Sequence, residues 1–329
     1  MPAFIIILST LALFIGLFIT YWLHSRVELG IQLNPADPPK VPVLISIIIP
    51  ARNEARNIRR CVEALLEQTY PKLELIVIDD RSTDGTARIL EEIQARDSRL
   101  VIVPGSDLPS EWAGKPHALV QGVAASQGEW LCFLDADTFA APELIASAFA
   151  AAQEHNADLY TALTQQELGS FWEKVVLPLV FTGLSFGFPA EKVNDPDKPE
   201  AIANGQFILI HRVVYEAVDG HRSVYNRIDE DKAFAEVVKG AGYRLIFADG
   251  KDLVRTRMYT SLPELWEGWT KNIFLGLRNR MGLLTFGATA ALLGAFVLPF
   301  WLFAGILWMG GGGGIPAVII TLEATLVWG

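Results

Sequence analysis

Short apolar runs alternate with segments of helical spacing through the first half of the chain. Runs typical of buried strands occupy residues 44–49, 73–78 and 130–134, and a further strand is predicted at 99–103. Helical periodicity covers residues 54–68, 86–97 and 117–126. Strands that are apolar on both faces suit the middle of a parallel sheet, and a regular succession of strand and helix builds right-handed crossovers. The pattern therefore predicts an α/β domain with a mostly parallel, Rossmann-like central sheet.

The second half of the chain has a less regular pattern. Helices are predicted at residues 142–155 and 229–241, and strands at 159–164, 206–211 and, as the final strand, 243–248. Residues 171–188 form an apolar segment that Pro178 is expected to break. Residues 261–280 have an amphipathic pattern, which fits a helix on a bilayer surface or a helix packed against the domain.

Both ends of the chain are strongly apolar. Residues 4–23 are long enough to cross a bilayer as a helix. Residues 281–309 and 315–329, separated by a glycine run, predict one full span and a second one that is either brief or cut short. No basic residue precedes the first run, which disfavours a cleaved signal peptide. His24, Arg26, Arg278 and Arg280 flank the spans on the side of the middle domain, so the positive-inside rule places that domain in the cytoplasm, at the inner or plasma membrane.

Composition and charge narrow the class of protein. Hydrophobic residues make up 51% of the chain, in agreement with membrane segments added to a soluble core. The net charge of −10 argues against a nucleic-acid partner. Cys61 and Cys132 lie in apolar patterns, and we expect them to be reduced core residues of a cytosolic domain.

Carboxylates follow three of the predicted strands. Glu54 comes after the first strand, Asp79 and Asp80 after the second, and Asp135 and Asp137 after the fourth. Ligands of open α/β sheets bind just outside the carboxyl ends of the strands, so these side chains are expected to face one crevice. Local turns are an alternative explanation for single acids. A divalent cation that carries a phosphate explains the whole cluster, because like charges without a cation would repel one another.

Four ordered blocks of sequence carry a resemblance to a known family. The blocks are SIIIPARNEARNI, LIVIDDRSTDGT, GKPHALVQGVAASQGEWLCFLDAD and DEDKAFAEVVKGAGYRL. Together they resemble glycosyltransferase family 2, whose members are inverting, nucleotide-sugar-dependent enzymes with a GT-A fold. The narrower combination of WAGKPHAL with RTRMYTSLPELWEGWTKN resembles the hopene-associated glycosyltransferases and related enzymes that glycosylate carotenoid or ceramide lipids.

The resemblance implies a role for each matching position. The implied donor-binding residues are Glu54, Asp79, Asp80, Lys115 and Asp135, with a UDP-linked donor, and the implied ligands of Mg²⁺ or Mn²⁺ are Asp137 and Asp135. Asp137, at the outer end, is the expected direct ligand, while Asp135 would also hold the strand end and the ribose. Asp231 would be the catalytic base that takes a proton from the acceptor hydroxyl. From position alone, Glu230 and Asp231 are better explained as acids that stabilise the first turn of a helix, and it is the other three blocks that favour a catalytic base.

Several positions depart from the family pattern or have an ordinary alternative. Many polymer-forming members carry Gln-x-x-Arg-Trp after the base, whereas residues 266–271 read WEGWTK, so polymer synthesis is not expected. Trp269 would stack on the sugar or nucleotide and Lys271 would meet the diphosphate, unless they are a core tryptophan and a solvated lysine. Arg81 stands where glycine is common, and Asp84 before Gly85 fits a turn with a helix cap.

The sequence as a whole predicts a membrane-anchored, metal-dependent hexosyltransferase. It would move one sugar from a nucleotide-sugar donor to the hydroxyl of a hopanoid-, isoprenoid- or ceramide-like lipid. The alternatives are a soluble or polymeric acceptor, a non-catalytic nucleotide-sugar-binding membrane protein, and a metal-dependent phosphotransferase. The expected organisation is a transmembrane helix (1–24), a proline-rich linker (25–43), a GT-A catalytic domain (44–260), an interfacial helix (261–280) and a C-terminal transmembrane region (281–329).

Overall fold

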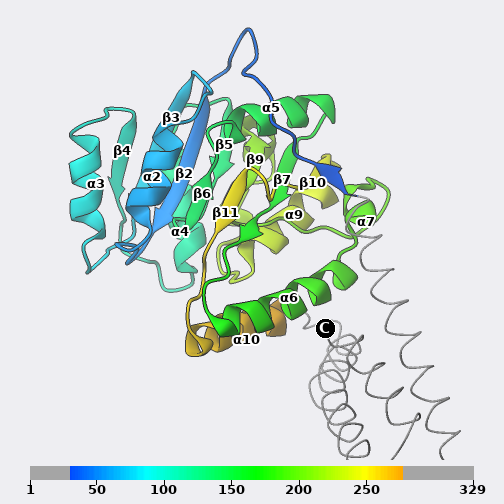
Figure 1. Ribbon diagram of the computed structural model, residues 1–329. Helices are drawn as coiled ribbons and strands as arrows, with labels where there is room; N and C mark the ends of the chain where they lie inside the picture. The colour runs from blue at the N-terminus through cyan, green and yellow to red at the C-terminus, as the bar shows by residue number, and fades with distance from the viewer. Residues whose placement is uncertain (1–29, 277–329) are drawn as a thin grey trace, which may run out of the picture. The chain divides into compact units, whose positions relative to one another are not determined.

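A computed structural model describes residues 30–276 of the chain (Figure 1). The predicted membrane segments at 1–24 and 281–329 lie outside the described residues. Residues 30–177 and 188–275 form one compact unit, and residues 178–187 belong to a second unit. Among residues 30–276, no helix is both long and apolar enough to cross a bilayer.

The larger unit is built on an eight-stranded sheet. Its strands, in spatial order, are β1 (Ile31–Gln32), β10 (Leu245–Asp249), β7 (Leu159–Leu163), β9 (Ile208–His211), β5 (Trp130–Phe133), β2 (Ile45–Ala51), β3 (Leu73–Asp79) and β4 (Leu100–Pro104). Only β9 is antiparallel to its neighbours in this sheet. The predicted α/β domain with a mostly parallel sheet is confirmed, and β5 occupies the expected central position.

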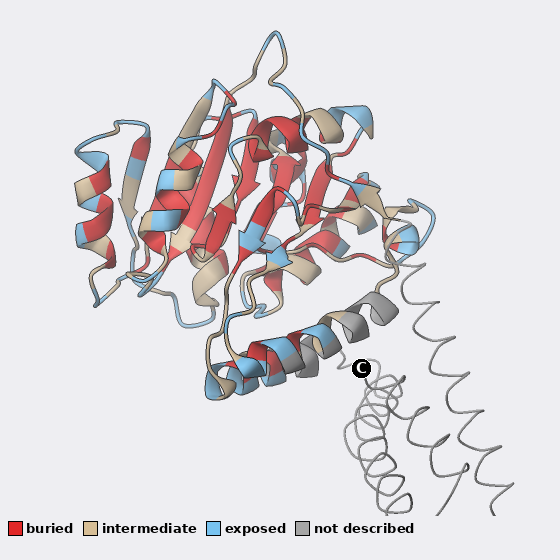
Figure 2. Ribbon diagram, in the orientation of Figure 1, coloured by how far each residue is buried: buried red, intermediate tan, exposed pale blue. Residues whose placement is uncertain are grey.

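Helices cover both faces of the sheet, because its central strands are apolar on both sides (Figure 2). In β2, Ile47 and Ile49 point to one face and Ile48 to the other. The first face packs against α2 (Ile58–Leu66), α3 (Thr86–Gln94) and α5 (Leu144–Glu154). The second packs against α4 (Gly114–Ala124), α7 (Ala190–Asn194), α8 (Arg212–Ala217), the 3₁₀ turn η1 (Gly220–Val224) and α9 (Glu230–Gly240). Cys61 and Cys132 are buried and free, as predicted.

A second, three-stranded sheet supports the segment that follows β5. It consists of β6 (Thr138–Ala140), β11 (Val254–Thr256) and β8 (Gln165–Gln166), with β11 in the middle. The Thr256 hydroxyl donates a hydrogen bond to the Asp137 carbonyl at 3.2 Å. The strand predicted at residues 243–248 is confirmed as β10. It is not the final strand, because β11 follows it, and a short strand such as β11 is stabilised by pairing with distant partners rather than by its own pattern.

Two further segments differ from the sequence pattern, and one agrees with it. The predicted break at Pro178 was wrong: α6 (Phe171–Gly187) continues through it, since a proline removes one backbone donor and the other hydrogen bonds of this 17-residue helix remain. α10 (Leu262–Gly276) forms within the predicted amphipathic segment. The segment expected to be a linker contributes β1 and the buried Leu33, which is 3% exposed.

Candidate active site

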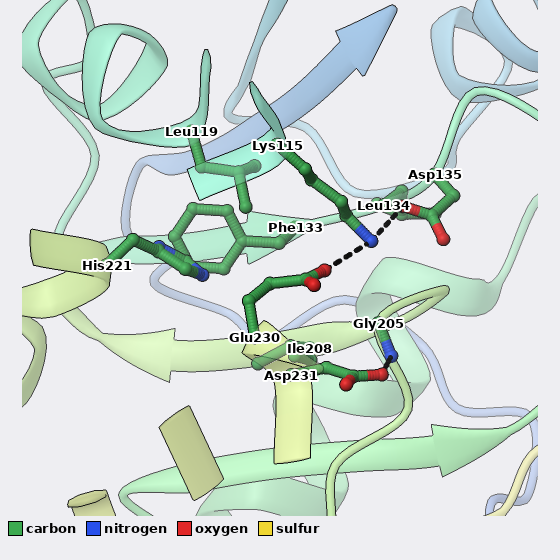
Figure 3. A pocket seen from close by; sticks show the side chains of 10 residues that line it. All are labelled: Lys115, Leu119, Phe133, Leu134, Asp135, Gly205, Ile208, His221, Glu230 and Asp231. Carbon is green, nitrogen blue, oxygen red and sulfur yellow. Dashed lines mark hydrogen bonds and ion pairs between the residues drawn. The ribbon is translucent and has the colours of Figure 1, made fainter. Parts of the chain in front are cut away.

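The carboxyl ends of β2, β3 and β5 border one crevice with a cavity volume of about 320 Å³. It is lined by Pro50, Ala51, Arg52, Glu54, Asp80, Gly114, Lys115, Ala118, Asp135, Ala136 and Asp137. A smaller pocket shares Lys115 and Asp135 with the crevice and also includes Glu230 and Asp231 (Figure 3). Side chains from both halves of the chain therefore meet at one edge of the sheet, where open α/β sheets bind ligands.

Asp135 and Asp137 lie directly after β5 and are poorly stabilised as anions. Burial raises the pKa of both carboxyls to about 6, and the charge of Glu54 adds to the effect on Asp137. Asp137 Oδ1 is buried and has no hydrogen-bond partner among residues 30–276. A carboxylate oxygen in this state gains most from a cation, because the cation supplies the interaction that the fold does not.

The carboxylates fit a hard divalent cation that is shared with a substrate. Within the described part of the chain, no group of three His, Cys, Asp or Glu side chains is arranged to hold a metal ion. Mg²⁺ needs only one or two carboxylates when substrate phosphates and water complete its coordination. Asp137 fits the role of direct ligand through its unpartnered Oδ1, whereas Asp135 Oδ1 is already paired with Lys115.

Lys115 connects the two carboxylate groups of the site. It lies in the first turn of α4, and its Nζ is 2.7 Å from Asp135 Oδ1 and 2.9 Å from Glu230 Oε1 (Figure 3). Burial alone would lower the pKa of Lys115, but the charges of Asp135 and Glu230 raise it well above the usual value. Lys115 is therefore a permanent cation between the end of β5 and the start of α9.

Asp231 is fixed in the first turn of α9. Its Oδ2 accepts a hydrogen bond from the Gly205 N–H at 3.0 Å, and its Oδ1 accepts one from the Lys232 N–H at 2.7 Å. Burial, reinforced by the charge of Glu230, raises the pKa of Asp231 to about 6. A Cβ on Gly205 would lie 3.0 Å from Lys115 Nζ and 3.1 Å from Asp231 Oδ2, so any larger residue there would displace these two side chains by a few tenths of an ångström.

The loop between β2 and α2 brings Glu54 to the crevice. The predicted helix at 54–68 begins only at Ile58, because Asn53 adopts a positive φ of 58° and the Glu54 N–H donates to Thr86 Oγ1 at 2.8 Å instead of starting a helical turn. Asn57 Nδ2 donates to Glu54 Oε2 at 3.1 Å. Burial raises the pKa of Glu54.

The acids after β3 have separate environments. Asp80 lines the crevice, where Arg81 Nε donates to its Oδ1 at 3.0 Å and Arg52 Nη1 lies 3.8 Å from its Oδ2. Asp79 faces its own loop, and its Oδ1 accepts from the Ser82 N–H at 3.2 Å. Asp84 accepts hydrogen bonds from the loop around it, which supports the turn and cap alternative for that residue.

The last two predicted donor-binding residues lie on α10. The Trp269 side chain is buried, at 8% exposure. The side chain of Lys271 lies outside the described residues. Their roles toward a donor remain predictions from the sequence.

Sequence reasoning missed two contributors to this pocket. Glu230 was assigned only a helix-end role, yet it is 6% exposed and holds Lys115. His221, on η1, lines the same pocket, and burial lowers its pKa to about 3, so it is neutral. The three adjacent acids at residues 229–231 could have indicated that Glu230 also takes part in the site. The sequence around His221 contains no comparable indication.

The chain belongs to glycosyl transferase family 2, whose family model matches residues 46–218. This span contains Glu54, Asp80, Lys115, Asp135 and Asp137, and it ends before α9. The fold is correspondingly the GT-A fold of glycosyltransferases, with its mostly parallel central sheet.

Two glycosyltransferases illustrate the similarity. The 4,4'-diaponeurosporenoate glycosyltransferase of Staphylococcus aureus is 28% identical over 267 residues, which cover 76% of this chain and 68% of that protein. The mannosyltransferase PcManGT of Pyrobaculum calidifontis, solved with GDP-Man and Mn²⁺, has a TM-score of 0.56 at 21% identity, over 99% of this chain and 96% of the other. At that identity, the second similarity shows a shared fold.

Proposed function

We propose that this chain is a metal-dependent, inverting glycosyltransferase that moves one sugar from a nucleotide-sugar donor to a hydroxyl of a lipid-like acceptor. The observation that carries the proposal is the arrangement around Lys115. Its ammonium lies between Asp135, on the side of the candidate metal ligands, and Glu230, next to Asp231 on the side of the candidate base. A donor diphosphate on one side and an acceptor oxygen on the other can therefore meet beside the fixed positive charge of Lys115.

Asp231 acts as the general base in this mechanism. As the acceptor oxygen attacks the anomeric carbon, its proton moves to a carboxylate oxygen of Asp231. The bond between the anomeric carbon and the diphosphate oxygen breaks in the same displacement, which inverts the anomeric centre. A pKa of about 6 keeps the carboxylate ionised at neutral pH and more basic than an ordinary aspartate.

The donor would occupy the crevice between Asp80 and Asp137. A bound Mg²⁺ or Mn²⁺ would neutralise charge on the departing nucleotide diphosphate. Asp137 and Asp135 would hold that ion, while Lys115 supplies a permanent positive charge beside them. Asp80 and Glu54, at the ends of the neighbouring strands, would accept hydrogen bonds from the nucleoside.

The proposed acceptor is a lipid at the cytoplasmic face of a membrane. The similarity to a protein named for 4,4'-diaponeurosporenoate supports a long apolar acceptor. The predicted spans on either side of the domain and the amphipathic α10, which exposes Trp266 at 73% while burying Leu265 and Trp269, support a location at the bilayer surface.

The test is transfer of a labelled sugar into extracted lipid. Membranes that contain the full chain are incubated with radiolabelled sugar nucleotides and Mn²⁺, and the organic phase is analysed. We expect labelled lipid with the native chain, none with Asp231→Asn, and native amounts with Glu236→Gln, an exposed position on the same helix. Full turnover in Asp231→Asn would refute the proposed role of Asp231 as the base. If the lipid stays unlabelled with every donor, the proposal that the acceptor is a lipid is refuted.

A further inference from the structure

His221 is a buried histidine to which the proposed mechanism gives no role. Its side chain is 1% exposed, and it lines the smaller pocket together with Glu230 and Asp231 (Figure 3). Burial, reinforced by the charge of Lys115, lowers its pKa to about 3, so the ring is neutral and does not take the proton of the acceptor. Because a polar ring is costly to bury, its place beside the reacting groups needs an explanation.

The imidazole ring joins β5 to α9. It stacks on Phe234 of α9, with ring centroids 4.7 Å apart and an interplanar angle of 21°. It also meets the edge of Phe133 of β5, at 4.7 Å and 86°. Phe133 lies just before Asp135, and Phe234 lies one helical turn after Glu230. His221 therefore contacts the two segments that carry the candidate metal ligands and the candidate base.

Lys115 bridges the same two segments through its ion pairs with Asp135 and Glu230. The two bridges act in opposite directions. The ion pairs draw the end of β5 and the start of α9 together, whereas the buried ring of His221 resists their approach, because protein interiors are close-packed and have few voids. The separation of the two segments is thus set by an attractive bridge and an incompressible one.

Tyr215, on α8, fixes the direction in which the imidazole faces. Its hydroxyl oxygen accepts a hydrogen bond from the His221 backbone N–H at 3.1 Å and lies 3.1 Å from His221 Nδ1. One hydroxyl therefore holds both the backbone and the ring of the same residue. A phenylalanine in place of His221 would fill a similar volume but would lack this bond to its ring.

The turn before His221 is shaped to bring this residue inward. Asp219 and Gly220 have positive φ values of 58° and 48°. A Cβ on Gly220 would lie 2.2 Å from Tyr215 Cζ, so only glycine allows the backbone to approach the phenol this closely. Asp219 has no such freedom and adopts the left-handed region at a cost. Strain retained where one imidazole enters the core indicates that the position of the ring matters.

We propose that His221 is a positioning residue for sugar transfer, whose ring sets the distance between the end of β5 and Asp231 at the start of α9. The inference rests on the proposed function for the roles of Asp135, Asp137 and Asp231. The acceptor oxygen has to reach the anomeric carbon and Asp231 at once, and a displacement of about 1 Å at a reacting centre can cost about 100-fold in rate. Loss of the ring leaves a cavity into which α9 can relax, while the groups that line the donor crevice stay in place.

The test measures apparent kcat and donor KM for variants of the full chain in membranes. The donor is whichever of radiolabelled UDP-glucose, UDP-galactose and GDP-mannose labels extracted lipid with the native chain. We expect His221→Ala to lower kcat by about 30–100-fold, whereas donor KM and the affinity for UDP or GDP with Mn²⁺ stay within about twofold, because only the transition state is affected.

Two milder variants separate the ring from its orientation. His221→Phe keeps a ring, and Tyr215→Phe removes only the hydroxyl, so each should lower kcat by about three- to tenfold. The matched control is Phe149→Ala, which removes a ring that is 7% exposed and packs against Trp130 at the opposite end of β5. We expect this control to lose stability and keep native kcat. All rates are measured below the melting temperature of each variant, so that unfolding is not counted as loss of kcat.

Native kcat in His221→Ala would overturn this inference and leave the proposed function intact. If His221→Ala does not fold, native kcat in both His221→Phe and Tyr215→Phe would do the same. An equal fall of kcat in Phe149→Ala would assign the effect to stability, and a rise in donor KM that accounts for the lost activity would assign it to donor binding; either result overturns the positioning role. Absence of labelled lipid with the native chain and every donor would overturn the proposed function, and this inference with it.

Discussion

Two sets of carboxylates at the same edge of the sheet have opposite electrostatic states. The turn carboxylate Asp84 accepts hydrogen bonds from the Ala55 N–H at 3.1 Å and the Thr86 N–H at 2.9 Å, and its bond from the Thr86 hydroxyl lowers its pKa. The pocket carboxylates Asp137 and Asp231 have pKa values raised to about 6 by burial. All three residues are aspartates, and each lies near the end of a strand or the start of a helix. Only their surroundings therefore distinguish Asp84 from Asp137 and Asp231.

The difference separates scaffold from site. A carboxylate whose anion is satisfied by backbone donors stabilises its own loop. A carboxylate whose anion is penalised by burial and like charge more than its hydrogen bonds stabilise it, as at Asp231 with its two backbone donors, costs stability and gains from an external cation or proton. By this criterion Asp137 and Asp231 are available for chemistry, and Asp84 holds the loop that positions Asp80.

The largest effect is expected at Asp137. Replacement by asparagine removes the negative charge and one of the two oxygens of the candidate metal ligand, and we expect the rate of sugar transfer to fall by about 10²–10⁴-fold, since a catalytic cation supplies several kcal/mol. Rates are measured at saturating Mn²⁺ with radiolabelled donor.

The stability of the same variant should not fall. With a pKa raised above its unfolded value, Asp137 contributes stability that is fully present below the unfolded pKa and is lost as the pH rises through about 6. At pH 7.5 without metal, Asp137→Asn should therefore melt no lower than the native chain, and added Mn²⁺ should raise its melting temperature less. A clear loss of thermal stability would assign Asp137 to the scaffold.

Glu230→Gln should lower kcat/KM by about 10–100-fold, as expected when a residue that orients metal-site groups is lost. The pH profile of kcat/KM tests whether Glu230 acts on the base.

In the native chain kcat/KM should fall as the pH is lowered through about 6, because Asp231 takes up a proton. Without the charge of Glu230 the pKa of Asp231 drops, so this fall should move to lower pH. Glu236→Gln, on the same helix, is the control, and an unshifted profile in Glu230→Gln would contradict its coupling to the base.

Gly205→Ala should lower kcat by about tenfold. The added Cβ would crowd Lys115 Nζ and Asp231 Oδ2, and displacements of a few tenths of an ångström are costly at a reacting centre. Gly240→Ala is the matched control, because a Cβ there meets nothing within 4 Å among the described residues. The control should keep full activity and gain about 0.5–1 kcal/mol of stability by removing a flexible residue from α9. Equal activities of the two variants would show that the space at Gly205 is not restrictive.

The smallest effect on chemistry is expected at Asp84. Asp84→Ala removes the acceptor for the Ala55 and Thr86 N–H groups, so the melting temperature should fall by a few degrees while kcat at saturating donor stays close to native. Calorimetry and rate measurements on one preparation check both parts. A loss of turnover as large as that of Asp137→Asn would remove the distinction between the two sets of carboxylates.

The sequence was informative wherever local pattern determines structure. Apolar runs located β2, β3, β4 and β5, and because parallel strands share one carboxyl edge, the acids after them were expected in one crevice. The motif blocks led to the family that the comparison confirms. The break predicted at Pro178 was wrong, because the remaining hydrogen bonds within α6 carry the helix through the proline. The short β11 was missed, because it forms by pairing with β6 and β8, which are distant in the sequence.

The sequence alone thus determined the order of the elements, the central place of β5 and the set of acids at its end, since strand polarity and hydrophobic period are local properties. The tertiary structure decided which acids are satisfied. Lys115 meets Glu230, and Arg52 meets Asp80, only after distant segments have packed together. Burial and the number of donors around a carboxylate, which set its pKa, arise from that packing, so the division between scaffold and site could be seen only in the folded chain.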